Sequence, residues 1–220
     1  MSKIGTGFSA IPQPADQGGR MDAPAFHRNH DPIWSVIGPW LTQQEGDVLE
    51  IGSGTGQHIV EFARKAPRLV WWPSDIVDAH LRSIEAWSAE AKLPNLRKPQ
   101  ILDLTDADWH LQSVDAPLTA IICINVLHIS PWRVSENLLA GAARLLRRGG
   151  RLFVYGPFMR DGAHTAPTNA SFDQSLRARN PDWGVRDITE ISALAVRLGL
   201  SAIDAAPMPA NNFILTAIRG

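Results

Sequence analysis

The sequence is poor in cysteine, in net charge and in long apolar runs, and each shortage excludes a class of protein. Cys123 is the one cysteine among 220 residues, so no internal disulfide can form, and we expect a reducing compartment, the cytoplasm. No apolar run reaches the roughly 18 residues that a membrane-spanning helix needs. No apolar core follows Lys3, as it would in a secretory signal. We therefore expect no membrane partner.

Net charge is almost absent as well. The 21 basic and 22 acidic residues leave a formal charge of −1, so the sequence offers no electrostatic case for binding nucleic acid. Metal ligands are also scarce. His27 and His30 have no third ligand near them in the sequence, and we expect no metal site. The oligomeric state is left open.

Glycine and proline dominate the first 24 residues, which contain few large apolar groups. We interpret residues 1–24 as a disordered N-terminal arm. Residues 25–220 have a length that suits one α/β domain. Asp31 followed by Pro32 is typical of a helix start, so we expect the first helix to begin there.

From residue 47 onward, short apolar segments alternate with stretches whose apolar residues recur at helical spacing. Strands that alternate with helices form parallel sheets, whereas two strands without an intervening helix add an antiparallel pair. The pattern predicts an α/β, Rossmann-like fold with a seven-stranded, mostly parallel sheet and a C-terminal antiparallel hairpin. The predicted strands are 48–51, 69–72, a third that ends near 101–102, 118–124, 151–155, 200–206 and 212–218.

About thirty residues, 157–187, belong to no predicted core element. Connections of this length inside a compact domain are usually functional or disordered. This segment leaves the carboxyl end of a strand, which is where open α/β sheets bind their ligands. We interpret 157–187 as a lid insertion. Together with the helix expected over 25–42, it suggests a small, enclosed substrate rather than a polymer.

The segment EIGSGTGQ, residues 50–57, places a glycine-rich turn between a predicted strand and a predicted helix. A dinucleotide-binding turn has the spacing G-x-G-x-x-G. Here the third glycine, Gly56, comes one position early, and Gln57 occupies its expected place. Glu50 also lies two residues before the first glycine, where a carboxylate would repel a pyrophosphate and attract a cation. S-adenosylmethionine carries a sulfonium and an ammonium group and no phosphate, so the motif favours it as the ligand.

These residues carry a resemblance to a known family. LEIGSGTG resembles the first motif, E/D-x-G-x-G-x-G, of class I S-adenosylmethionine-dependent methyltransferases. The resemblance implies that Asp75 accepts hydrogen bonds from the ribose hydroxyls. It also implies that Asp103 and Leu104 lie near the adenine and that Asn125 faces the methyl group. The implied cofactor residues are Glu50, Gly52, Ser53, Gly54, Gly56, Asp75, Asp103, Leu104 and Asn125.

A narrower resemblance rests on segments spread along the chain. They are similar to the methyltransferase-like 26 group, domain-of-unknown-function family 938. Because the substrate of that family is itself poorly defined, the resemblance implies the cofactor rather than the reaction. The segments are HRNHDPI, EIGSGTGQH, PSDI, NVLHISPW, YGPF and SFDQSLRARNPDWGVRD.

Three residues are candidates for catalysis: Asn125, His128 and Tyr155. A histidine can titrate near neutrality and act as a general base, but the apolar neighbours of His128 equally suit a packed histidine. Tyr155 ends a predicted strand at the same edge of the sheet as Asn125, where it would face the ligand, or it packs against the lid. The sequence N-V-L-H that begins at Asn125 departs from the N-P-P-Y pattern of enzymes that methylate DNA bases or glutamine.

Five polar residues are candidates for holding the substrate. Arg28 and Asn29 precede the helix expected from Asp31. The lid offers three more, of which an arginine can clamp a carboxylate or a phosphate. Arg177 alternatively forms an ordinary surface pair with an acid four residues before it. The three in the lid are Asn169, Arg177 and Arg186.

The sequence therefore predicts an S-adenosylmethionine-dependent methyltransferase that acts on an unidentified small molecule. Two alternatives remain. One is a protein that binds S-adenosylmethionine without transferring its methyl group, since the cofactor motifs would look the same. The other is a nicotinamide-dependent oxidoreductase, which the glycine spacing and Glu50 disfavour.

Overall fold

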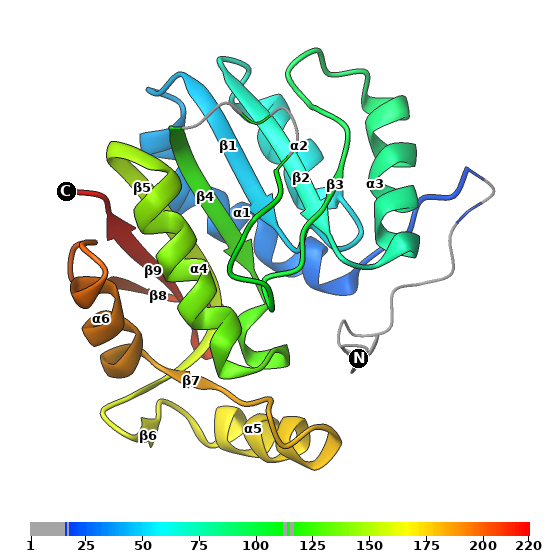
Figure 1. Ribbon diagram of the computed structural model, residues 1–220. Helices are drawn as coiled ribbons and strands as arrows, with labels where there is room; N and C mark the ends of the chain where they lie inside the picture. Colours follow the sequence, from blue (N-terminus) through cyan, green and yellow to red (C-terminus); the bar gives the residue numbers. More distant parts are fainter. Residues whose placement is uncertain (1–15, 17, 112–113, 115–116) are drawn as a thin grey trace. The chain divides into compact units, whose positions relative to one another are not determined.

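The structure is a computed structural model that describes residue 16 and residues 18–111, 114 and 117–220. Contacts divide the chain into two compact units. The first unit comprises the chain up to Asp103 together with the segment 110–115. The second comprises Leu104–Trp109 and the chain from residue 116 to the C-terminus. Each unit combines helices with a sheet (Figure 1).

The first unit contains three parallel strands in the order β3-β2-β1. Ile51 at the end of β1 pairs with Ser74 in β2, and Asp75 at the end of β2 pairs with Ile101 in β3. The carboxyl ends of the three strands therefore lie along one edge. The elements are α1 (Pro24–Leu41), β1 (Gly46–Ile51), α2 (Gln57–Lys65), β2 (Leu69–Asp75), α3 (Asp78–Ala91) and β3 (Gln100–Ile101).

Burial of one face of each helix stabilises this unit. In α2, Ile59, Phe62 and Ala63 are fully buried at the spacing of one helical face. On β2, the Trp71 side chain is also fully buried. The helix that was expected to begin at Asp31 begins instead at Pro24, the first helical position, where the missing N–H costs nothing. Pro32 then lies inside α1, because the burial of the helix outweighs one lost backbone hydrogen bond.

The segment Arg20–Ala23, which we call the strap, precedes α1. Its Met21 N–H donates a hydrogen bond to Ser83 Oγ at 2.8 Å, and its Ala23 N–H donates one to Gln57 Oε1 at 2.7 Å. The prediction of a disordered arm is therefore corrected for the strap, because these bonds and the α3 surface offset the entropy of ordering it. For residues 1–15 and 17 that prediction lies outside the described residues.

The second unit contains a row of strands in the order β4-β5-β9-β8, and the two short strands β6 and β7 pair with β5 outside this row. β4 is buried along its whole length and pairs in parallel with β5, whereas β9 pairs antiparallel with both β5 and β8. Helices α4 and α6 contact each other and β5. The elements are β4 (Leu118–Ile124), η1 (Leu127–Ile129), α4 (Trp132–Leu145), β5 (Leu146–Arg160), β6 (Ala163–His164), α5 (Pro167–Arg179), β7 (Arg186–Asp187), α6 (Ile188–Arg197), β8 (Asp204–Met208), η2 (Pro209–Asn211) and β9 (Asn212–Ile218).

The predicted α/β fold with a mostly parallel sheet and a C-terminal antiparallel pair is confirmed. Among the residues that the structure describes, no helix has the length and apolar character that a membrane crossing requires. That one domain spans 25–220 stays a prediction.

The predicted lid, 157–187, is folded rather than loop-like. β5 continues to Arg160, β6 turns back antiparallel to it, and β7 returns to pair with it in parallel, so that Phe158 is opposite Arg186. Helix α5 follows β6 and precedes β7 along the chain (Figure 1). The segment is thus anchored at both ends to one strand. Its role as a cover for substrate stays a prediction.

Gly56 places the start of α2 against α3. Its φ is +90°, and a Cβ added there would lie 2.9 Å from the Ile84 Cα, closer than real side chains come to backbone. Gly54, in the same turn, also has a positive φ of +57°, but an added Cβ would meet no atom within 4 Å. The two glycines therefore separate backbone strain from steric overlap.

We predict that Gly56→Ala lowers the free energy of unfolding by about 3 kcal/mol or more, since strain and overlap add. Gly54→Ala, the matched control, should cost only about 1 kcal/mol, because strain acts alone. Urea unfolding of both variants measures the difference. Equal losses would show that the approach of α2 to α3 does not depend on the absence of a side chain.

Candidate functional site

A glycine loop, residues 52–56, connects β1 to α2. Gly52, Gly54 and Gly56 have φ values of +65°, +57° and +90°, a region in which other residues are strained. The Gly54 N–H donates a hydrogen bond to Asp75 Oδ2 at 2.8 Å, which ties the loop to the end of β2. The side of the loop on which a Gly54 side chain would lie is open. This leaves room for a ligand against the loop backbone.

Glu50 lies on β1 just before this loop and is only 2% exposed. Among the described residues, none forms a hydrogen bond with its buried Oε2 atom. Burial raises the pKa of Glu50 from 4.5 to about 8, the Ser53 hydroxyl lowers it, and the negative charge of Asp75 raises it further. A buried, unpartnered carboxyl oxygen is costly unless a cation or a donor is brought to it.

Asp75 holds both the glycine loop and the start of α3. Its Oδ2 accepts from Gly54 N–H, and its Oδ1 accepts from the Val77 N–H at 2.9 Å. Asp75 therefore caps the start of α3 and can still bind a ligand, because each carboxylate oxygen keeps a further lone pair. Asp75 is 6% exposed and His80 Nδ1 lies 3.2 Å from Oδ1.

Ser53 and Ser74 fix the loop to the strands. The Ser53 N–H donates to the Ser74 carbonyl at 2.8 Å, and the Ser74 hydroxyl donates to the Glu50 carbonyl at 2.7 Å. Both serines are buried. Ser53 therefore acts on the loop geometry through its backbone, and its hydroxyl also lies 3.4 Å from the Glu50 carbonyl.

Asp103 and two isoleucines lie near the carboxyl ends of β2 and β3. Asp103 follows β3 and is exposed. Ile76 and Ile101 expose 38% and 70% of their surfaces, unusual for such large apolar side chains. Neither isoleucine was predicted as a site residue, although Ile76 directly follows Asp75. Their exposure at the ends of β2 and β3, beside the three acids Glu50, Asp75 and Asp103, depends on a strand register that only the fold supplies.

In the second unit, Asn125 directly follows β4 and has a left-handed conformation, with φ of +59°, which asparagine tolerates better than most residues. Its N–H donates to the Tyr155 carbonyl at 2.9 Å, so β5 holds this backbone in place. Tyr155 is 7% exposed. Leu104 is buried, and its carbonyl accepts from the Asn137 side chain at 2.7 Å.

His128 lies in the short helix η1 and is buried. Burial lowers its pKa to about 4, and the positive charge of Arg186 lowers it further. Its ring contacts Phe172 edge-on, with centroids 5.5 Å apart. The histidine is therefore neutral at pH 7 and weakly basic, which weakens the case for general-base catalysis.

Arg186 was a candidate for clamping a substrate, but the structure turns it inward. Its Nε donates to the Leu127 carbonyl at 3.2 Å, and one terminal nitrogen donates to the carbonyls of Ser130 and Asp182. The guanidinium also lies over the Trp132 ring. Arg186 therefore holds the 127–130 turn, a role that its place in sequence does not reveal.

The other two lid candidates also have partners within the second unit. Asn169 is buried and donates to the Asn211 carbonyl at 2.9 Å. Arg177 donates to Asp173 Oδ2 at 2.9 Å, which is the ordinary pair considered as the alternative, and stays half-exposed. Of the three lid residues, Arg177 is the one whose side chain remains accessible.

Arg28 and Asn29 lie inside α1 rather than before it. Arg28 is exposed, whereas Asn29 is buried and its oxygen accepts from His58 Nε2 at 2.8 Å. Burial lowers the pKa of His58 to about 3, and the charge of nearby His30 lowers it further. Asn29 therefore links α1 to α2, and nothing in this arrangement directs it toward a ligand.

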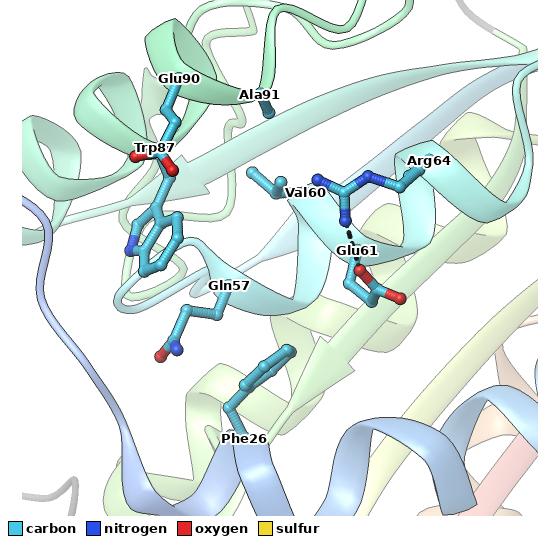
Figure 2. Close-up of a pocket in the computed structure, with 8 residues that line it drawn as sticks. All are labelled: Phe26, Gln57, Val60, Glu61, Arg64, Trp87, Glu90 and Ala91. Carbon is cyan, nitrogen blue, oxygen red and sulfur yellow. Dashed lines mark hydrogen bonds and ion pairs between the residues drawn. The ribbon is translucent and has the colours of Figure 1, made fainter.

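A cavity of about 190 Å³ lies between α1, α2 and α3, with Phe26, Val60 and Trp87 in its lining (Figure 2). Arg64 on its rim forms an ion pair with Glu61 at 2.6 Å. The lining includes Gln57 but no residue that was predicted to hold the cofactor. Within the described ranges no cluster of three or more potential metal ligands occurs.

The chain is similar to known proteins, both in sequence to one family and in structure to several solved proteins. A family model described as "Protein of unknown function (DUF938)" matches residues 20–219. An O-methyltransferase family protein from Burkholderia thailandensis is similar in structure, with a TM-score of 0.75 and 18% identity over 89% of this chain. The S-adenosylmethionine-dependent methyltransferase SibL, in its apo form, has a TM-score of 0.70 and 19% identity over 89%.

A third similar structure is magnesium protoporphyrin IX methyltransferase (ChlM) from Synechocystis PCC 6803 with bound SAH. Its TM-score is 0.65, with 17% identity over 88% of this chain. The matches cover 83% of that protein, but only 57% and 55% of the Burkholderia protein and SibL. At these identities the likeness shows the fold, which is that of class I methyltransferases.

We predict that Glu50→Gln stabilises the protein increasingly as the pH rises. The folded carboxyl keeps its proton until about pH 8, whereas the unfolded one loses it near 4.5. The contribution of the protonated Glu50 to the free energy of unfolding is therefore fully present below pH 4.5. It is lost as the pH rises toward 8, by up to about 1.4 kcal/mol per pH unit. Glutamine has no such proton. Urea unfolding at pH 5, 6.5 and 8 should show a widening gap, and the exposed control Glu85→Gln should show none.

We also predict that Arg186→Ala lowers the free energy of unfolding by about 3 kcal/mol, because it leaves buried carbonyl oxygens without donors. Arg148→Ala, which removes an exposed arginine, should change it by less than about 0.5 kcal/mol. Thermal or urea unfolding measures both. Similar effects for the two variants would mean that the Arg186 hydrogen bonds do not stabilise the 127–130 turn.

Proposed function

We propose that this chain, which belongs to the family described as protein of unknown function (DUF938), is an S-adenosylmethionine-dependent methyltransferase that acts on a small molecule. The proposal rests first on Glu50. A buried carboxyl oxygen without a hydrogen-bond partner, next to an open glycine loop, suits a ligand that carries positive charge.

The residues of the first unit fit this cofactor better than a dinucleotide. A pyrophosphate bound at the loop would face the carboxyl groups of Glu50 and Asp75 at the ends of two adjacent strands. The sulfonium and ammonium groups of S-adenosylmethionine are instead attracted by them. The bound S-adenosylhomocysteine of the similar ChlM structure supports the same choice.

Each residue then has a proposed role. Glu50 pairs with the cationic amino-acid end, and the backbone of Gly52–Gly56 provides a surface without side chains. Asp75 uses its remaining lone pairs for the ribose hydroxyls. Ile76 and Ile101 offer apolar surface to a flat base, and Asp103 offers an acceptor for an amine. The roles of Leu104 and Asn125 in the second unit stay as the resemblance implies them.

When bound, S-adenosylmethionine supplies an electrophilic methyl group on its sulfur. The protein contributes mainly alignment and exclusion of water, so a strong general base is not required. This agrees with the low pKa of His128. Tyr155 and Asn125 stay as candidates for positioning the acceptor, and Arg28 and Arg177 as candidates for contacting it.

A small-molecule acceptor is the proposed substrate class. The similar magnesium protoporphyrin IX methyltransferase is named for a small-molecule substrate. The N-V-L-H sequence after β4 also differs from the N-P-P-Y pattern of enzymes that methylate DNA bases or glutamine. The cytoplasm remains the proposed compartment, on the basis of the single buried cysteine.

Calorimetric titration tests the proposal directly. The wild type should bind S-adenosylmethionine and S-adenosylhomocysteine and should not bind NADH. Glu50→Gln and Asp75→Asn should weaken S-adenosylmethionine binding at least tenfold, because each removes a charged contact worth roughly 1.5–3 kcal/mol. Glu85→Gln and Asp78→Asn, the same substitutions at exposed positions of α3, are the controls.

Proton release provides a second measurement in the same experiment. Glu50 is largely protonated at pH 7 in the free protein, so pairing it with a cation should release up to roughly one proton. The binding heat should therefore differ between Tris and phosphate buffers, and the difference should vanish in Glu50→Gln. Binding of NADH would instead favour the oxidoreductase. Cofactor binding without conversion to S-adenosylhomocysteine in a small-molecule extract would favour a binding protein.

A further inference from the structure

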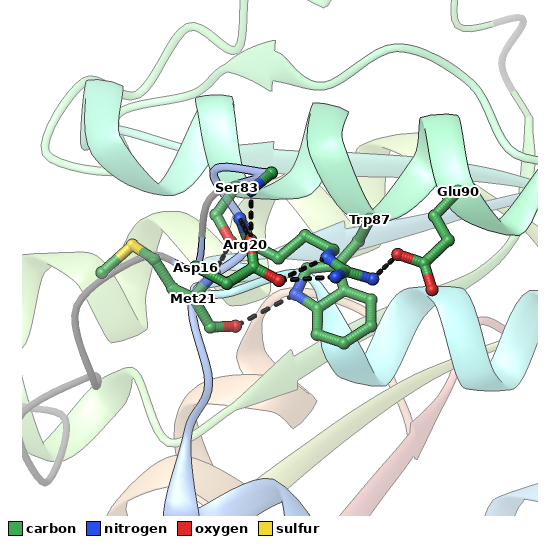
Figure 3. Close-up of polar contacts among 7 residues, drawn as sticks. Asp16, Arg20, Met21, Ser83, Trp87 and Glu90 are labelled. Atoms are coloured by element: carbon green, nitrogen blue, oxygen red, sulfur yellow. Dashed lines mark hydrogen bonds and ion pairs between the residues drawn. The ribbon is translucent and has the colours of Figure 1, made fainter.

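The strap, Arg20–Ala23, is attached to the outer side of α3 by several contacts (Figure 3). The Arg20 guanidinium lies 5.1 Å from the centre of the Trp87 ring and forms ion pairs with Asp16 and Glu90. The Trp87 Nε1 donates to the Met21 carbonyl at 3.0 Å. An aromatic ring, an acid and a hydrogen bond thus fix the strap in position before α1 begins.

Ser83 connects the strap to the glycine loop through two hydrogen bonds. Its side chain is fully buried, and its Oγ accepts from the Met21 N–H at 2.8 Å. The same hydroxyl donates to the Thr55 carbonyl, also at 2.8 Å. One buried hydroxyl therefore bonds the strap and the loop at the same time.

Gln57 makes a second bridge. Its Oε1 accepts from the Ala23 N–H at 2.7 Å and from the Thr55 hydroxyl at 3.0 Å, while its Nε2 donates to Asp22 Oδ1 at 2.7 Å. The Gln57 side chain is 5% exposed. This residue stands where a dinucleotide-binding turn has its third glycine. Here an amide side chain replaces that glycine and connects the loop to the strap.

Both bridges end at Thr55 and Gln57, in the last part of the glycine loop and at the first residue of α2. The three glycines of this loop have positive φ. Glycine loses more conformational entropy on ordering than any other residue, so a loop of this composition is costly to fix when a ligand binds. We infer that the strap orders the glycine loop before the cofactor arrives, with Gln57 and Ser83 as positioning residues. This inference rests on the proposed function for the identity of the ligand.

Two consequences follow. Loss of either bridge should weaken cofactor affinity although neither side chain is a proposed ligand, because the binding energy must then also order the loop. Coupling is reciprocal, so a bound cofactor should in turn hold the strap more firmly. Amide hydrogen exchange reads the loop and the strap separately, with or without a ligand.

The test compares Gln57→Ala and Ser83→Ala with Gln43→Ala and Ser88→Ala, all in the full chain. Gln43 is exposed beyond α1, and the Ser88 hydroxyl donates to the Ile84 carbonyl in its own helix. We expect the two bridge variants to exchange faster at residues 52–57 without ligand and to bind S-adenosylmethionine about tenfold more weakly. The two control variants should match the wild type in both measurements.

Two further variants keep the test valid if a bridge variant folds poorly. Arg20→Ala removes the guanidinium contacts of the strap with the Trp87 ring and Glu90 without touching α2, and should also speed exchange in the loop. Gln57→Glu places a second carboxylate against Asp22 and should weaken binding. Adding Asp22→Asn restores an amide-to-carboxylate hydrogen bond with the partners reversed, and should recover most of the lost affinity.

The outcomes separate the two proposals. If the wild type does not bind S-adenosylmethionine, the proposed function fails. The unliganded exchange rates then still decide whether the strap orders the loop. If the wild type binds and the bridge variants bind equally well with unchanged exchange, the inference is overturned and the proposed function stands. Faster exchange across the whole first unit, not only in the loop, would also overturn it.

Discussion

The close approach of two backbones at Gly56 and Ile84 determines the arrangement of the first unit. Because Gly56 has no side chain, α2 can begin directly against α3, within a distance that any Cβ would violate. The neighbours of this contact, Thr55 and Ser83, then meet in a hydrogen bond. The glycine loop, the start of α2 and the middle of α3 therefore form one junction, and the strap is bonded to it.

Glu50 introduces a cost that the fold tolerates. Its carboxyl group is buried at the end of β1, and the pKa of about 8 reports how unfavourable its charged form is there. A buried acid that is neutral at pH 7 contributes little to stability, and it can pair with a cation once it releases its proton. This opposition between stability and binding is typical of functional sites. It distinguishes Glu50 from Asp75, whose two oxygens already accept backbone hydrogen bonds.

In the second unit, three residues that were predicted to contact substrate or cofactor form hydrogen bonds to main-chain carbonyls. Arg186 bonds to carbonyls of the 127–130 turn, Asn169 bonds to the Asn211 carbonyl, and the backbone of Asn125 bonds to β5. Polar side chains that are buried must find partners, so their proximity to a ligand cannot be read from polarity alone. The accessible Arg177 remains the better candidate for contact with a substrate.

The sequence by itself determined the α/β class, the mostly parallel sheet with its C-terminal antiparallel pair, the family and the glycine motif. Hydrophobic periodicity and glycine-rich turns can be identified from neighbouring residues alone, because they are local properties of the chain. Tertiary structure decided which polar side chains are buried with partners inside the fold and which remain accessible. The ordered strap, the inward Arg186 and the exposed Ile76 and Ile101 all depend on contacts between residues distant in sequence. Such contacts arise from packing, for which no local pattern exists, and so the position of a side chain in the chain does not reveal its partner.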